Sequence, residues 1–365
     1  MPAYKDKKRG TWYVSFNYKD WQGKQRKTLK RGFATKREAL QYENEFKQKK
    51  SGTMDMDLKA FYEVYKEDHY PRIRESTASM KDYIFEDKIL PYFGDMKVRD
   101  ISARDIIKWQ NELLKKIDPN TGEKYSKSYL KTIHNQLSAI FNFAVRFYQL
   151  KENPAKIAGN IGSERDIETE FWTLEEYRKF ANEAMKNPEY YYAFETLYWM
   201  GIREGEMLAL TKRDIDFTNK VMTINKTYQK VRGVEMTGPT KTAKGSRKIA
   251  IPDNLLEELK EYMEMIYDLK DTDRIFNMTK SGLYREMTRA SKAAGVKKIR
   301  VHDIRHSHVS LLINLGYSPV AIAERVGHES IYITFRYAHM FPELRNNMAE
   351  KLNGLMEEAD GEKDG

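Results

Sequence analysis

Residues 301–312 read VHDIRHSHVSLL and place three of the chain's seven histidines beside one arginine. His302 and Arg305 stand three positions apart at the predicted start of a helix, so both side chains can point to one side. Five of the seven histidines lie in the last 64 residues. This concentration of imidazole and guanidinium groups predicts a catalytic or anion-binding site in the C-terminal, mainly helical part of the chain.

A second polar group follows further along the chain, in the sequence GYSPVAIAERVGHES. Ser318 is typical of a helix N-cap, Pro319 of the first helical position, and Gly327 of the residue that ends a helix. We therefore expect a short helix with His328 just beyond its C-terminal end. Tyr337 lies nine residues after His328, in the sequence FRYAHMFP.

The third polar group lies upstream, in the sequence YWMGIREGEMLAL. Gly201 is predicted to end one helix and Arg203 to start the next, where free amides favour an anion. A guanidinium suits a phosphate because its planar fork makes two parallel charge-assisted hydrogen bonds. Arg203 and Arg305 could therefore hold both non-bridging oxygens of one phosphodiester and stabilise a pentacovalent transition state.

Taken in order, these residues resemble the motif of the tyrosine recombinases, specifically the phage and integrative-element integrases. The motif comprises Arg203, a hairpin lysine, His302, Arg305, His328 and Tyr337. In that family the tyrosine attacks the scissile phosphate, forms a 3′-phosphotyrosyl bond and releases a 5′-hydroxyl. The resemblance implies a site-specific recombinase that integrates and excises a mobile element or prophage, with Tyr337 as nucleophile. It further implies that the arginines and histidines hold the phosphate while the lysine protonates the leaving oxygen.

Two assignments within this motif have rivals. The family's Lys-Thr pattern falls on Lys241, which we favour, but Lys244 lies three residues away on the same predicted turn. Tyr332 is the rival of Tyr337. The remaining histidines of the cluster are expected to cap, pack or support rather than catalyse; they are His306, His308 and His339.

Other functions would use some of the same residues. His302 and His306 have the i, i+4 spacing of helical metal ligands, as in a metal-dependent nuclease, but the chain has no HExxH motif and the arginines would crowd a cation. A DNA-binding protein that has lost catalysis would not need all six catalytic residue types. A type IB topoisomerase shares the chemistry, but the basic N-terminal region favours integration.

Composition excludes several further classes. The chain has 365 residues and no cysteine, which excludes disulfides, thiolate catalysis and cysteine metal sites. It has no GxxxxGK[ST] loop for a nucleotide, no apolar run near the roughly 20 residues that a bilayer requires, and no secretory signal. We expect a cytoplasmic protein that works without cofactor, metal or membrane.

Charge and hydrophobic periodicity predict a multidomain, mainly α-helical chain. Residues 1–50 hold 15 Lys/Arg and 5 Asp/Glu, so their net charge of 15 − 5 = +10 equals that of the whole chain. A basic excess in one small segment suits a polyanion-binding module. We predict an arm-type DNA-binding domain over 1–53, a helical core-binding domain over 54–160, and a mixed α/β, mainly helical catalytic domain over 161–365.

The N-terminal domain is predicted to be a three-stranded sheet with one helix. Residues 11–18 alternate as a half-buried strand does, Lys24–Leu29 form a basic second strand, and Gly32–Phe33 a short third. A capping box at Thr35 starts a helix to about Lys50.

The other two domains are predicted from their helix signals. Four helices are expected in the core-binding domain: one from Leu58 closed by Pro71, one capped by Ser76 and stopped by Pro91, one capped by Ser102, and one capped by Ser126. In the catalytic domain, Thr173 should cap a helix. Residues 221–228 and 245–251 should form a β-hairpin joined by a Gly/Thr/Lys-rich loop.

The resemblance also implies partners. These are double-stranded DNA with core-type and arm-type sites, a homo-tetramer on that DNA, and an excisionase or host DNA-bending protein. Residues 342–356 are expected to form an amphipathic helix that docks on a neighbouring subunit.

Overall fold

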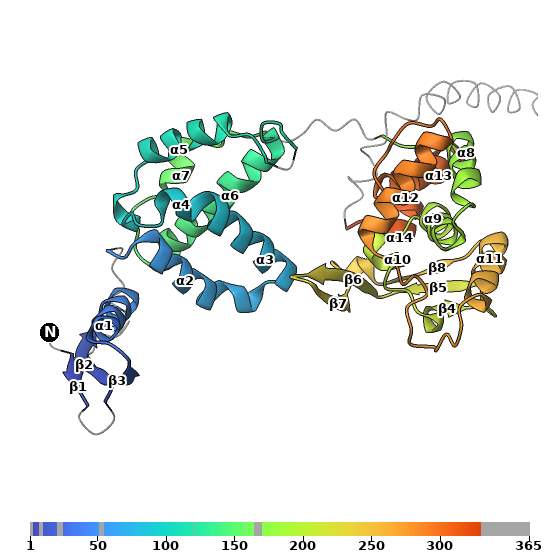
Figure 1. Cartoon of the computed structure of the whole chain (residues 1–365). Helices are drawn as coiled ribbons and strands as arrows, with labels where there is room; N and C mark the ends of the chain where they lie inside the picture. The colour runs from blue at the N-terminus through green and yellow to red at the C-terminus, as the bar shows by residue number, and fades with distance from the viewer. Residues whose placement is uncertain are drawn as a thin grey trace, which may run out of the picture. The chain divides into compact units, whose positions relative to one another are not determined.

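The computed structural model describes residues 3–6, 10–19, 25–50, 55–119, 121–163 and 170–329. The chain divides into two compact units, Met1–Ile167 and Glu168–Gly365 (Figure 1). Among the residues described, no helix is both long enough and apolar enough to cross a bilayer.

A small antiparallel sheet and a helix form the start of the first unit. The strands lie in the order β1-β2-β3; they are β1 (Tyr4–Lys5), β2 (Trp12–Lys19) and β3 (Gln25–Phe33), followed by helix α1 (Lys36–Lys50). Val14 and Phe16 point from β2 into a core that includes Ala39 of α1. Thr35 caps α1, as predicted, by accepting a hydrogen bond from the Glu38 amide at 3.2 Å.

The predicted third strand is wrong, although the sheet does have three strands. Gly32–Phe33 form the end of β3, and the third strand is Tyr4–Lys5, which pairs with β2. The register of β2 against β3 shifts opposite Trp12 and Tyr13, where Gly32 lies in β3. This bulge interrupts the alternation, so the glycine resembles a strand break in the sequence.

Helices make up the rest of the first unit. They are α2 (Leu58–His69), α3 (Glu75–Ile84), α4 (Leu90–Phe93), α5 (Ala103–Lys115), α6 (Lys127–Phe147) and α7 (Pro154–Ala158). Ser102 and Ser126 cap α5 and α6, as predicted. The core between the helices is aromatic and aliphatic, with Phe85, Trp109 and Phe141 fully buried.

Two boundaries in this helical part differ from the prediction. The N-cap of α3 is Arg74, so Ser76 lies inside the helix. Pro91 does not stop a helix but lies in the first turn of α4. The π-helical segment Phe85–Ile89 joins α3 to α4. Pro71 does lie at the end of α2, within a 3₁₀ turn.

The second unit surrounds a small sheet with helices. The helices are α8 (Leu174–Ala184), α9 (Pro188–Met200), α10 (Glu204–Met207), α11 (Asp253–Glu264), α12 (Lys280–Ala293), α13 (Asp303–Asn314) and α14 (Pro319–Val326). The strands are β4 (Ile215–Asp216), β5 (Val221–Ile224), β6 (Lys226–Val231), β7 (Val234–Pro239) and β8 (Arg247–Ala250). Thr173 forms the predicted capping box at the start of α8.

The predicted β-hairpin is correct in pairing β5 with β8, but the predicted first strand, 221–228, runs across β5 into β6, and the predicted connection is wrong. Strands β5 and β8 pair antiparallel, with Val221 opposite Ala250. The connection is not simply a loop, because β6 and β7 form a second two-stranded sheet within it. Arg232 and Gly233 turn between them with positive φ angles of 49° and 83°, the pattern of a two-residue hairpin turn. Arginine is an unusual residue there, and this hides the turn from sequence analysis.

Candidate active site

Arg203 stands in the short connection between α9 and α10. Gly201 ends α9 with a left-handed φ of 61°, and a Cβ there would come within 2.3 Å of the His308 ring, so the position requires glycine. Two residues later, the Arg203 Nη1 donates to Glu206 Oε1 at 2.7 Å. The Arg203 side chain is 31% exposed, so a ligand can still reach its guanidinium.

Glu206 is a buried carboxylate shared between two arginines. Its Oε1 accepts from Arg203, and its Oε2 accepts from Arg247 Nη2 at 3.0 Å and from the Arg203 amide at 3.0 Å. Burial alone would raise the pKa of Glu206, but Arg247 and Arg203 outweigh it and hold the pKa below its ordinary value. The carboxylate therefore stays ionised and fixes both guanidinium groups.

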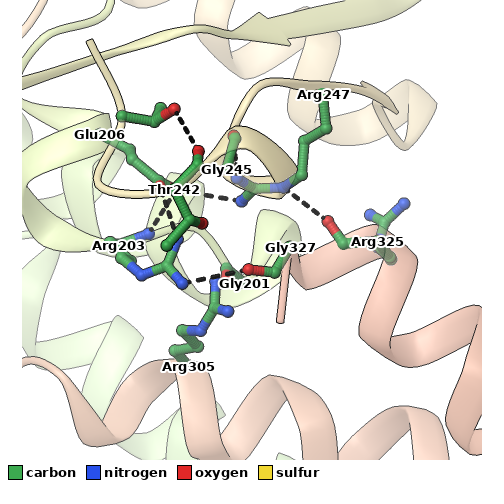
Figure 2. A network of polar contacts seen from close by, with 10 residues as sticks. Gly201, Arg203, Glu206, Thr242, Gly245, Arg247, Arg305, Arg325 and Gly327 are labelled. Atoms are coloured by element: carbon green, nitrogen blue, oxygen red, sulfur yellow. Dashed lines mark hydrogen bonds and ion pairs between the residues drawn. The ribbon is translucent and has the colours of Figure 1, made fainter. Parts of the chain in front are cut away.

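Arg305 approaches the same place from helix α13. Its Nη1 donates to the Gly201 carbonyl at 2.8 Å, and the residue is only 3% exposed. Figure 2 shows the guanidinium groups of Arg203 and Arg305 gathered beside Gly327. The two arginines predicted to share a phosphate thus lie on different elements and come together in the fold.

His302 occupies the N-cap position of α13, on the exposed side of the site. Its pKa is lowered by desolvation and by the positive charge of Arg305. The ring of His306 lies edge-on to it, with centroids 5.2 Å apart. Desolvation and His302 lower the pKa of His306 to about 4, although the His306 ring lies 3.7 Å from Asp303. Both rings are therefore neutral at pH 7.

His328 is placed by the end of helix α14. Ser318 caps that helix and Gly327 ends it with a left-handed φ of 69°, both as predicted. The amides of Gly327 and His328 donate to the carbonyls of Glu324 and Ala323, which closes the helix in a Schellman arrangement. His328 is 7% exposed, and desolvation, Arg305 and Arg203 lower its pKa to about 3.

The two ends of the site are joined directly. Arg203 Nη2 donates to the Gly327 carbonyl at 3.1 Å, linking the start of α10 to the end of α14. A Cβ on Gly327 would lie 2.9 Å from the Lys244 carbonyl and 3.0 Å from Arg247, so glycine also permits the hairpin loop to approach.

The candidate lysines lie on the loop between β7 and β8. Both are exposed, and the loop contains a 3₁₀ turn, Ala243–Gly245. Lys244 Nζ donates to the Glu329 carbonyl at 3.3 Å. Lys244 also lines a hollow of about 310 Å³ together with His328 and Gly327. The structure therefore sets Lys244 beside His328, while Lys241 lies three residues earlier on the same exposed loop.

His308 has a packing position behind the site. It is 2% exposed, it contacts Gly201, and its Nε2 accepts from Arg325 Nε at 3.2 Å. Desolvation lowers its pKa to about 3, so the ring is neutral and can accept this bond. Arg325 also donates to the carbonyls of Trp199 and Ala250.

Three further residues, which hold the site together through hydrogen bonds, were not identified from the sequence. Glu206, Arg247 and Arg325 look like ordinary surface charges in a chain that is 32% charged. The spacing of Arg203 and Glu206, three residues apart at a helix start, is the one local signal that could have indicated their pairing. Arg247 and Arg325 meet through the fold alone.

The described part of the site is a set of fixed guanidinium groups with neutral imidazoles. Such a set can bind one phosphodiester, accept a proton and stabilise extra negative charge as it develops. Tyr337, its rival Tyr332, His339 and the predicted helix over 342–356 lie outside the described residues.

Three family models match the chain in succession. The model described as the phage integrase family matches residues 170–343. The model of the phage integrase N-terminal SAM-like domain matches residues 57–114, and that of the arm DNA-binding domain matches residues 2–50.

Several relatives are similar over most of the chain. The ICEBs1 integrase of Bacillus subtilis (strain 168) is 30% identical over 293 residues, covering 75% of this chain and 76% of the relative. The tyrosine recombinase XerC-like protein of Caldanaerobacter subterraneus is 29% identical, covering 71% and 73%. The integrase of Staphylococcus phage L54a is 27% identical, covering 68% and 82%.

Solved structures share the fold at lower identity. The Tn1549 transposon integrase in complex with circular intermediate DNA is similar with a TM-score of 0.65 and 19% identity, covering 81% of this chain and 100% of that one. A lambda integrase dimer bound to a COC′ core site has a TM-score of 0.58 and 20% identity, covering 92% and 94%.

Proposed function

We propose that this chain, which belongs to the phage integrase family and is a tyrosine-type site-specific recombinase, breaks and rejoins DNA strands through Tyr337. The observation that carries the proposal is the meeting of Arg203, Arg305 and His328, which come from three separate elements. Two guanidinium groups and a neutral imidazole at one point match the chemistry of a single phosphodiester.

In the proposed reaction, the phosphate lies between Arg203 and Arg305. The Tyr337 oxygen attacks phosphorus, and the bond from phosphorus to the 5′ oxygen breaks. His302 accepts the tyrosine proton, because its lowered pKa keeps the ring neutral at pH 7. The result is a 3′-phosphotyrosyl bond and a 5′-hydroxyl, and no ATP is needed because the new bond keeps the energy of the old one.

A lysine of the β7–β8 loop protonates the leaving 5′ oxygen. The family pattern supports Lys241, and the position of Lys244 beside His328 keeps it as the rival. Arg203, Arg305, His302 and His328 then hold the phosphate through the reaction.

We also propose the DNA sites and protein partners with which this reaction takes place. Core-type DNA sites are assigned to the two later domains, 54–160 and 161–365, and arm-type sites to the basic residues 1–53. A homo-tetramer on DNA is supported by the lambda integrase tetramer bound to a Holliday junction. An excisionase or a host DNA-bending protein would set the direction of the reaction, integration or excision of the element.

A covalent-trapping assay tests the mechanism. The substrate is a core site, mapped from element–chromosome junctions, with a nick near the cleavage position so that the cleaved strand diffuses away. Wild-type protein should form a covalent adduct in EDTA, and Tyr337→Phe should form none. An adduct with Tyr337→Phe, or none with wild type, would sink the proposal.

The same assay separates the two lysines. Replacing the 5′ bridging oxygen by sulfur gives a thiolate leaving group that needs no proton from the protein. Lys241→Met should lose adduct formation on normal DNA and recover it on the sulfur substrate, whereas Lys244→Met should be close to wild type on both. The reverse pattern would assign the proton to Lys244.

A further inference from the structure

Each nitrogen of the Arg247 guanidinium donates a hydrogen bond to an acceptor within the protein, unlike the nitrogens of an arginine that binds a phosphate. Its Nε donates to the Arg325 carbonyl at 2.9 Å, its Nη1 to the Gly245 carbonyl at 2.8 Å, and its Nη2 to Glu206 Oε2 at 3.0 Å. The side chain is 7% exposed. Its donors are thus directed inward at the protein, which Figure 2 shows as dashed lines to three separate segments.

Each of these three segments carries a residue assigned to the reaction. Glu206 holds the Arg203 guanidinium. Arg325 lies in the last turn of α14, three residues before His328. Gly245 follows Lys244 in the loop that carries both candidate lysines.

We propose that Arg247 is a positioning residue that holds the β7–β8 loop, the end of α14 and the Glu206–Arg203 pair in one catalytic arrangement. The proposal rests on the function proposed above, since it assumes that these groups act on one phosphate. Arg247 does not touch the DNA; it acts through its three acceptors.

The shape of the guanidinium explains why an arginine is needed. Its three nitrogens lie in one plane and donate in fixed directions, so one side chain can define the relative places of three acceptors. A lysine ammonium at the same position has a single nitrogen and cannot reach three acceptors that diverge around a plane. Arg247→Lys therefore keeps the charge beside Glu206 and removes the geometry.

The close packing at Gly327 supports the same reading. A Cβ there would come within 3.0 Å of Arg247 Nη1 and Cδ, so the arginine lies against the backbone that leads into His328. Displacement of Arg247 would free the loop and the α14 terminus together.

The test uses the full-length chain and the nicked core-site substrate. At saturating protein, Arg247→Lys should slow adduct formation by about 10²-fold, the cost of misplacing a reacting group by about 1 Å. The dissociation constant for DNA should change by less than about twofold, because no phosphate contact is lost. Arg289→Lys is the control: it replaces a more exposed arginine that is also paired with a buried carboxylate, Glu286, but lies outside the site on α12.

A second readout separates positioning from a general loss of folding. On the substrate with a sulfur at the 5′ bridging position, Arg247→Lys should recover at least about tenfold of its lost rate, because the misplaced lysine is no longer needed. A partly unfolded protein would be equally slow on both substrates, so equal rates on the two would overturn the proposal.

The remaining outcomes are also decisive. If wild-type protein forms the adduct and Arg247→Lys forms it at the wild-type rate, the positioning role is wrong and the proposed function stands. If Arg247→Lys and the Arg289→Lys control slow the reaction equally, the role is structural and the inference is wrong. If wild-type protein forms no adduct, the proposed function fails first and the inference with it.

Discussion

Each unit of the chain buries a basic side chain, and the two units surround that side chain with different hydrogen-bond partners. In the first, Lys81 is 7% exposed and donates to Gln136 Oε1 at 2.7 Å and to the Tyr65 hydroxyl at 3.3 Å, which are both neutral groups. Burial lowers its pKa. In the second, Arg247 and Arg203 share the ionised carboxylate of Glu206.

The difference lies in what each side chain requires of its surroundings. A buried lysine can give up its proton, so neutral partners suffice and the surrounding helices set its place. A buried guanidinium stays charged and needs acceptors in fixed directions. Arginines in the second unit therefore determine geometry, and the lysine in the first unit fills a gap between α3 and α6.

The strongest test of this contrast is Arg305→Lys, which keeps a basic group and removes the planar fork. We expect the rate of covalent adduct formation to fall by about 10³-fold, the range lost when one donor to a developing anion is removed. Thermal unfolding of the variant is measured beside the rate, so that a loss of activity through unfolding is recognised. A rate within tenfold of wild type would mean that charge alone suffices at this position.

The fold was predictable wherever a local signal marks an element. Ser102, Ser126, Thr173, Ser318 and Gly327 all begin or end helices as the sequence indicates, because a cap depends on residues within one turn. Two local signals misled: Ser76 lies inside α3, whose N-cap is Arg74, and Pro91 lies within α4. The other errors fall where no local signal exists. The two-residue strand Tyr4–Lys5 is too short to alternate, and the β6–β7 hairpin turns at an arginine.

The site follows the same rule. Arg203, His302, Arg305 and His328 were found because a family motif and helix ends mark them. Arg247 and Arg325 were missed because Arg247 lies 41 residues from Glu206 and 78 residues from Arg325, and only the tertiary structure joins them. Glu206 was missed although its spacing from Arg203 offered a local signal. Sequence thus indicates the groups that we propose bind the phosphate, and it misses the groups that hold them in place.

A buried neutral histidine provides a second, smaller test, because the pKa of His308 differs between the folded and the unfolded chain. In the folded state the pKa of His308 is about 3, below the ordinary 6.5, because it is buried beside Arg325. Protonation therefore favours unfolding: the stabilisation is complete above pH 6.5 and is lost as the pH falls toward the folded value. This single histidine should lower the free energy of unfolding by about 1.4 kcal/mol per pH unit across that window.

The measurement compares wild type with His308→Gln, which keeps an acceptor for Arg325. Urea unfolding at pH 7.0, 6.0 and 5.0 should show the difference between the two proteins shrinking as the pH falls. Carboxylates contribute to the slope of both proteins and cancel in the difference. A difference that stays constant with pH would show that His308 is not buried in its neutral form.

The smallest expected effect belongs to Lys81 and tests the other side of the comparison. Because its partners are neutral, Lys81→Met should change the stability of the first unit by less than about 1 kcal/mol, as replacing a buried charge by a similar apolar volume often does. Hydrogen exchange of peptides from α3 and α6 measures this locally, and exchange in α13 of the second unit is the internal control.

Arg247→Met should instead cost about 3–5 kcal/mol, because it leaves the buried Glu206 carboxylate with one cation fewer. If the two substitutions cost the same, buried lysine and buried arginine have equivalent roles in this chain, and the distinction between filling a gap and determining geometry is wrong.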